Sequence, residues 1–249
     1  MRKTQLSPRL SALAGIPSRV YLFLTFKGGM VKPLFYYLYI RGVIMNLNTI
    51  VNEFNVMSKD GFNSHENRQK YVREYSWSVP CEEALDAIIK FADGGTILEI
   101  GSGTGLWAKL LQERGAKIIA TDIADNTHGH EKRYCDIENI EAFSAIEKYN
   151  DCDVIMYSWP SYGAFWTGRS LATWIGKYFK NKLIYIGESY GGCTGDDRFN
   201  SIAGSGQEHC IPLKQWYGLH DELMLIEFSN TAIMKAKKEL RDCEEIKNS

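Results

Sequence analysis

An acid followed by three glycines, and a second acid about twenty residues later, stand near the middle of this 249-residue chain. The apolar run Thr96–Ile100 carries an acid, Glu99, next to its end. Three glycines follow, at Gly101, Gly103 and Gly105. Glycines let a backbone turn sharply and approach a ligand closely. A second apolar run, Lys117–Thr121, ends in Asp122, where a carboxylate about twenty residues after the glycines can accept hydrogen bonds from ribose hydroxyls. The residue types and their spacing therefore predict a nucleotide site.

The elements that must position these residues can be read from the same stretch. Apolar residues recur at helical spacing after the glycines, at Leu106, Trp107, Leu110 and Leu111. Gly115 then stands where a helix commonly ends. Strand, glycine loop, helix and strand form half of a βαβ unit, in which the helix N-terminus offers unpaired N–H groups to the ligand.

The third glycine distinguishes between two nucleotide classes. A dinucleotide fingerprint places it three residues after the second glycine, where this chain has Leu106. The pattern here, E-x-G-x-G-x-G, resembles motif I of the class I S-adenosylmethionine-dependent methyltransferases. We therefore favour S-adenosylmethionine as cofactor over NAD(P), and we expect a tight turn without a ligand to need neither three glycines nor two acids.

The resemblance implies that Glu99 braces the glycine loop or the methionine amine, while Gly101, Ser102, Gly103 and Gly105 contact the cofactor. It also makes Asp122 the ribose-binding acid, with Ile123 beside it.

A third strand is expected at residues 132–135, followed by Asp136 and Ile137. The family resemblance makes this pair the adenine site, with the carboxylate accepting the exocyclic amine and the isoleucine stacking on the ring. Alternatively, Asp136 caps the helix that follows.

The methyl acceptor is expected after the fourth strand, which is the apolar run Val154–Ser158. The sequence Ser-Trp-Pro-Ser-Tyr at 158–162 resembles the [D/N/S]-P-P-[Y/F/W] motif of amino-group methyltransferases, although Trp159 replaces the first proline and Tyr162 falls one residue late. Ser158 is expected to reach the cofactor. Trp159 and Tyr162 would contact a planar acceptor, or they could be ordinary core or lid residues.

A glycine-rich loop with three acids, residues 187–197, follows the fifth strand. Such backbone freedom at a strand end favours close approach to a ligand or a mobile lid, although solvated turn acids would look alike. Glu188 is the first candidate for a catalytic base. Two histidines, His128 and His130, lie near Cys135 but lack further ligands at suitable spacing, so no metal is expected.

Strands and helices alternate along the chain, which predicts a Rossmann-like, doubly wound α/β fold. We expect a mostly parallel seven-stranded sheet with helices on both faces. The last two strands, near 209–213 and 223–228, are joined by a loop without a helix, so the last strand can pair antiparallel. This arrangement, too, resembles the class I methyltransferase sheet, and ligands in such sheets bind at the carboxyl ends of the strands. The resemblance covers residues 70–228.

Composition limits the partners. The formal net charge is -1, which implies no constitutive nucleic-acid binding. Six scattered cysteines without a C-x-x-C pair fit a reducing compartment, and we expect a cytoplasmic protein. The methyl acceptor could be a small molecule, a protein or a nucleobase. A cofactor-binding module that acts through a partner without methylating is the alternative function.

The first 44 residues differ from the rest of the chain. They hold seven Lys or Arg and no acid, and their two aromatic-apolar runs are too short to span a membrane. A presequence, an interfacial anchor and an upstream extension that ends before Met45 remain open, and we expect this segment to pack poorly. The remaining boundaries are a helical lead-in at 45–94, the methyltransferase-like core at 95–230 and a charged helix at 231–249.

Overall fold

The computed structural model describes residues 45–59, 64–123, 132–189 and 192–247. Residues 45–249 form one compact unit by their contacts. The expectation that residues 1–44 pack poorly falls outside the described residues, as do His128 and His130. Within the described ranges, no helix is both long and apolar enough to cross a lipid bilayer.

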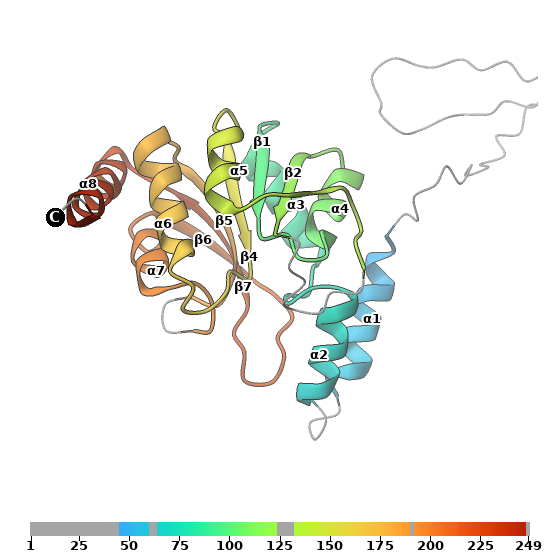
Figure 1. Cartoon of the computed structure of the whole chain (residues 1–249). Coiled ribbons are helices and arrows are strands. Elements are labelled where there is room, and N and C mark those ends of the chain that lie inside the picture. Colours follow the sequence, from blue (N-terminus) through green and yellow to red (C-terminus); the bar gives the residue numbers. More distant parts are fainter. Residues whose placement is uncertain (1–44, 60–63, 124–131, 190–191, 248–249) are drawn as a thin grey trace, which may run out of the picture. The chain divides into compact units, whose positions relative to one another are not determined.

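In the described part of the chain, seven strands form one sheet in the order β3-β2-β1-β4-β5-β7-β6 (Figure 1). Their bounds are Thr96–Ile100 (β1), Lys117–Asp122 (β2), Ile137–Asn139 (β3), Val154–Ser158 (β4), Lys182–Gly187 (β5), Gln207–Pro212 (β6) and Glu222–Glu227 (β7). Strands β1 to β5 pair in parallel, while β7 runs antiparallel to both of its neighbours. The predicted fold, including its antiparallel last strand, is therefore confirmed.

The central strands are buried on both faces because helices cover the sheet on either side. The helices are Leu47–Met57 (α1), Ser64–Glu74 (α2), Glu82–Ala92 (α3), Leu106–Glu113 (α4), Ala142–Lys148 (α5), Trp166–Ala172 (α6), Asp197–Ala203 (α7) and Asn230–Lys247 (α8), with a π-helical turn, η1, at Thr173–Lys177. Alternate residues of β1 point to opposite faces. Ile97 joins the cluster that includes α1, α3 and α4, and Leu98 joins the cluster beneath α5, α6, α7 and α8.

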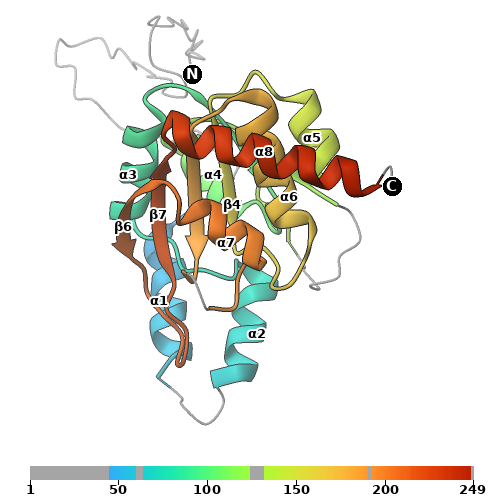
Figure 2. The same cartoon turned by 90° about the vertical axis from the view of Figure 1, so that its left-hand side faces the viewer.

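Helix α8 lies across the second face of the sheet, over α6 and η1 (Figure 2). The packing is close at Gly176, where an added Cβ would approach the backbone nitrogen of Lys237 to 2.8 Å. Any larger residue would therefore push α8 away from the core.

Two elements differ from the sequence-based expectation. Within the predicted helical lead-in, α2 was not expected as a separate helix, because most of its residues are polar or charged. Among its described side chains, only Tyr71 and Val72 are fully buried. The third strand was placed wrongly at 132–135. That segment instead passes beside the glycine loop, with the Tyr134 N–H donating to the Thr104 carbonyl at 2.9 Å. The strand begins later because Ile137 is the residue that pairs with Ala120 of β2.

Candidate functional site

The chain order reverses between β1 and β4, and a cavity of about 500 Å³ lies there. After β1 the chain builds outward through β2 and β3, then returns to add β4 on the other side of β1. Such a switch point leaves a crevice outside the carboxyl ends of the strands. The cavity is lined by Trp77, Ile100, Gly101, Gly103, Asp122, Ile123, Arg133, Ile140, Glu141, Ala142, Phe143, Ser158, Trp159, Pro160, Ser161, Ala164 and Trp166.

The glycine loop forms one end of this cavity. All three of its predicted glycines have a left-handed backbone, with φ of 72°, 57° and 72° at Gly101, Gly103 and Gly105. At Gly105 an added Cβ would come within 2.7 Å of the Cys135 sulfur, so this position also lacks space for a side chain. The loop therefore requires glycine for its left-handed backbone and, at Gly105, also for the lack of space for a side chain.

The Asp122 carboxylate and the Thr121 carbonyl, at the end of β2, hold the glycine loop to that strand. The Gly103 N–H donates to the Asp122 carboxylate at 2.5 Å. The Gly101 and Ser102 N–H groups both donate to the Thr121 carbonyl, which also accepts the Ser102 hydroxyl at 3.1 Å. Asp122 and its neighbour Ile123 line the cavity, as the ribose-binding prediction requires.

Glu99 lies beneath the loop and is completely buried. Neither carboxylate oxygen has a hydrogen-bond partner among the described residues. Burial raises the pKa of Glu99 to about 8; the Ser102 hydroxyl opposes this shift and the Asp122 carboxylate adds to it. An unpartnered buried carboxyl group normally requires an explanation, and Glu99 does not itself line the cavity.

The residues that reach the cavity from β3 are not those expected. Asp136 precedes the strand and is exposed, and neither Asp136 nor Ile137 lines the cavity. Ile137 instead packs toward Gly105. Because the strand begins later than predicted, the residues at its carboxyl end are Ile140 to Phe143, and these line the cavity.

Trp159 forms the opposite wall in an unusual backbone conformation. Its φ is 56°, in the left-handed region that a bulky residue rarely occupies. Its N–H donates to the Ile186 carbonyl at 2.8 Å, and its indole Nε1–H donates to Asp221 Oδ1 at 2.8 Å. Its ring stacks on Trp77 with centroids 5.2 Å apart. Strained residues held by several contacts are characteristic of functional sites.

Asp221 was not identified from the sequence, yet it is fully buried behind this wall. Its second oxygen, Oδ2, has no partner in the described part of the chain. Burial raises the pKa of Asp221 to about 6, while the Trp159 indole and the Arg68 charge oppose the shift. Asp221 immediately precedes β7, and the antiparallel direction of β7 brings its start to the edge where the parallel strands end. An acid before an antiparallel last strand is therefore the signal that could have revealed it.

Arg68 reaches this wall from α2. Its guanidinium carbon lies 4.8 Å from the Trp77 ring centroid and 4.7 Å from that of Trp159. Burial lowers the pKa of Arg68, and the nearby Asp221 charge opposes that effect. This residue also was missed, because α2 itself was not predicted.

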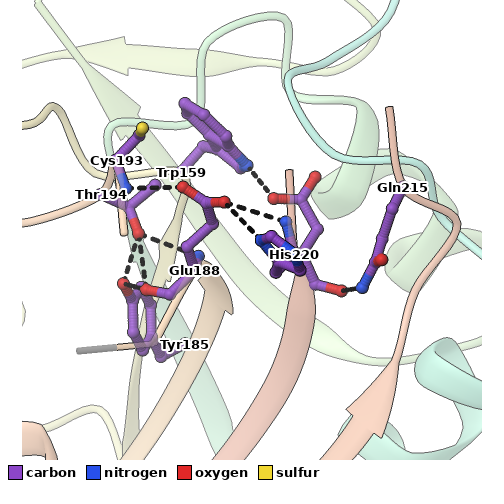
Figure 3. Close-up of polar contacts among 8 residues, drawn as sticks. Trp159, Tyr185, Glu188, Cys193, Thr194, Gln215 and His220 are labelled. Carbon is purple, nitrogen blue, oxygen red and sulfur yellow. Dashed lines mark hydrogen bonds and ion pairs between the residues drawn. The ribbon is translucent and has the colours of Figure 1, made fainter. Parts of the chain in front are cut away.

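Glu188 is nearly buried, and its two oxygens accept backbone N–H groups, from Cys193 at 2.6 Å and from His220 at 2.9 Å (Figure 3). Burial opposes its negative charge, but these hydrogen bonds together outweigh burial and lower the pKa. Glu188 does not line the cavity. Tyr162, the other predicted acceptor contact, is 74% exposed and also lies outside the lining.

No group of three potential metal ligands occurs among the described residues. The histidines considered from the sequence, His128 and His130, are not part of that set.

Comparison with known proteins gives one family match. A family model described as a methyltransferase domain matches residues 68–180. No curated protein matches the chain. Similar solved structures include WbdD, at 14% identity and a TM-score of 0.41 over 59% of this chain and 35% of WbdD, so the chain spans about a third of that protein. A putative O-methyltransferase from Klebsiella pneumoniae has 12% identity and a TM-score of 0.43 over 71% of this chain and 90% of its own. A mutant of MtNAS in complex with S-adenosylmethionine has 11% identity and a TM-score of 0.40 over 74% and 73% of the two chains.

Proposed function

We propose that this chain, which belongs to the class I S-adenosylmethionine-dependent methyltransferase superfamily, transfers a methyl group from S-adenosylmethionine to a planar acceptor, with an amino group as the favoured target. The observation that carries this proposal is the single cavity at the switch point. Its lining includes Gly101 and Gly103 of the glycine loop with Asp122 at one end, and Trp77 with Trp159 at the other. One cavity with two such ends can hold a cofactor and an acceptor in contact.

The residues at the first end fit the cofactor. Asp122 would accept the ribose hydroxyls, and Gly101 to Gly105 would let the backbone approach the methionine part. Glu99, whose oxygens lack partners in the described part of the chain, would brace the loop or accept the methionine amine. Ile140 and Glu141, at the end of β3, take the adenine role that the sequence assigned to Ile137 and Asp136.

The chemistry required of the protein at the second end is modest. Bound S-adenosylmethionine supplies a methyl group that is already activated by its sulfonium. The chain must orient the acceptor and exclude water, and orientation can contribute ~7–11 kcal/mol to such a reaction. Trp77, Trp159 and Ser158 would hold a planar group against the methyl donor.

A proton acceptor at the second end is not required for an amino group, because its lone pair attacks before the proton leaves. Glu188 is a poor base in this arrangement, since both its oxygens accept backbone N–H groups away from the lining. We assign it instead to bracing the described residues Cys193 and Thr194 against the end of β5. Tyr162, being exposed, would contact an acceptor only where that acceptor extends beyond the cavity.

Calorimetry with S-adenosylmethionine and S-adenosylhomocysteine tests the cofactor half of the proposal. Binding of both is expected, and a folded protein that binds neither at millimolar concentration would refute it. Transfer of a tritiated methyl group to fractionated small molecules, protein and RNA then tests the reaction.

The alternative function is a cofactor-binding module that no longer methylates. One observation favours it: the acceptor end of the lining, within the described residues, carries hydroxyl and aromatic groups and no carboxylate or imidazole. Tight cofactor binding without a labelled product in any fraction would select this alternative.

A further inference from the structure

A cation-binding site is already built into the wall behind the proposed acceptor subsite. Two tryptophan rings, Trp77 and Trp159, lie beside a fully buried carboxyl group, Asp221. We call these three residues the tryptophan–carboxylate cage. Aromatic faces attract cations through their quadrupole, and a carboxylate adds a full negative charge. Open cages of this composition bind quaternary and other organic cations.

In this protein the cage holds a cation of its own. The Arg68 guanidinium carbon lies within 4.8 Å of both ring centroids. Its charge and that of Asp221 stabilise each other, although both groups are largely withdrawn from water. In the described part of the chain, Arg68 Nε and Nη2 and Asp221 Oδ2 are buried without hydrogen-bond partners. Charge and stacking on the rings, rather than a hydrogen-bonded ion pair, therefore hold Arg68 in place.

A second carboxylate near Arg68, that of Glu188, does not change the conclusion that charge and stacking hold Arg68 in place. Glu188 also acts on Arg68, but two backbone N–H groups already satisfy its oxygens. Arg68 thus lies beside both rings and close to Asp221, in the place of a ligand cation.

We propose that Arg68 determines acceptor specificity by filling the cation position of this cage, so that the cavity accepts a planar group without positive charge. This inference rests on the proposed function, because the cavity side of Trp77 and Trp159 is taken as the acceptor end. Arg68 does not line the cavity, so it acts through the two rings and is a positioning and selecting residue rather than a catalytic one.

Two planar probes of similar shape, one neutral and one cationic, test the proposal. Quinoline is planar and neutral when unprotonated, and N-methylquinolinium is its permanently cationic counterpart. Their binding is measured by calorimetry on the full chain saturated with S-adenosylhomocysteine. The wild type is expected to prefer quinoline by roughly tenfold or more, since a second cation gains little from rings that already carry one.

The substitution Arg68→Met empties the cation position while keeping an unbranched side chain. We expect the preference to reverse in favour of N-methylquinolinium. Arg68→Lys keeps the positive charge and should keep the wild-type preference, which preserves the test if Arg68→Met folds poorly. Arg73→Met, on the same helix, is the matched control and should leave both affinities unchanged.

Equal affinity of the two probes in the wild type would overturn the proposal, as would an unaltered preference in a folded Arg68→Met protein. Failure of wild-type protein to bind quinoline, or quinoline binding that survives Trp77→Ala, would overturn it as well. Binding of S-adenosylhomocysteine is recorded in every experiment. Its persistence separates a wrong acceptor subsite from a failure of the proposed function itself.

Discussion

The two ends of the cavity are built in different ways. The proposed cofactor end comes mainly from one short stretch, Gly101 to Ile123, in which each loop follows directly from its strand, and Ile140 and Glu141 add to it after β3. The acceptor end is assembled from α2, the segment before α3, the end of β4 and the start of β7. A local site depends on backbone conformation at a few positions, whereas an assembled site depends on contacts between side chains far apart in the chain. The two ends should therefore fail differently when residues are changed.

The largest expected effect concerns the buried acid beneath the cofactor end. The pKa of Glu99 rises from an ordinary 4.5 to about 8 in the folded protein. The folded state therefore keeps a proton that the unfolded state loses between these values, and this contribution to stability disappears as pH rises from 4.5 to 8. The total loss corresponds to roughly 4–5 kcal/mol.

Urea unfolding of the wild type and Glu99→Gln, compared at about pH 5 and about pH 9, measures this loss, since glutamine does not titrate. Between these two pH values the unfolding free energy should fall less in the variant than in the wild type, and the difference should be most of that loss. The exposed Glu83→Gln serves as control. Equal slopes in all three proteins would show that Glu99 does not titrate in this range.

The next effect tests whether the glycine loop depends on local conformation alone. Gly105 and Gly115 both have left-handed backbones, but only Gly105 lacks space for a Cβ. Each alanine substitution should cost ~1–2 kcal/mol for the conformation. Gly105→Ala should cost a further ~1–3 kcal/mol for the clash with Cys135 and Ile137. Unfolding free energies give both values, and identical losses would mean that the loop relaxes without strain.

A smaller effect, at the cofactor itself, is expected from Asp122. Hydrogen bonds to charged groups contribute ~1.5–3 kcal/mol, so Asp122→Ala should weaken S-adenosylmethionine by roughly tenfold to a hundredfold. The exposed Asp136→Ala, whose side chain lies outside the cavity lining, should change the affinity by less than about twofold. Calorimetry decides, and a larger effect at Asp136 would restore the adenine role that the sequence suggested for it.

The acceptor end should show coupling between distant residues. Asp221→Leu and Trp159→Phe each remove the same hydrogen bond, so their effects on unfolding free energy should not add. We expect a coupling of about 1–2 kcal/mol in the double variant. Affinity for S-adenosylhomocysteine should stay within about twofold, because neither residue belongs to the glycine loop. Fully additive losses would contradict the link between the two side chains.

The smallest effect is expected from removing residues 1–44. Residues 45–249 form their own compact unit, so a protein that starts at Met45 should fold and bind cofactor as the full chain does. Thermal melts of both proteins measure the difference. A loss above ~2 kcal/mol, comparable to removing one fully buried large side chain, would make that segment part of the core.

The sequence by itself determined the sheet, the glycine loop and the position of Asp122. Hydrophobic periodicity and glycine spacing act over a few residues, and the parallel order of strands follows from their alternation with helices. Sequence reasoning failed where the signal is weak: α2 has few apolar residues, and β3 is a three-residue strand. The misplaced strand is why the sequence assigned the adenine contact to Ile137, whereas Ile140 is the isoleucine after β2 that lines the cavity with Ile123.

Only the tertiary structure decided the acceptor end. Nothing local to Asp221 or Arg68 indicates that they meet at Trp159, because the antiparallel pairing of β7 and the docking of α2 bring them there. Glu188 looked like a base because it follows a strand, yet the fold turns two N–H groups toward it. Residue type and spacing identify a site whose geometry is set by one loop. A site made by side chains from four separate segments exists only once packing has brought those segments together.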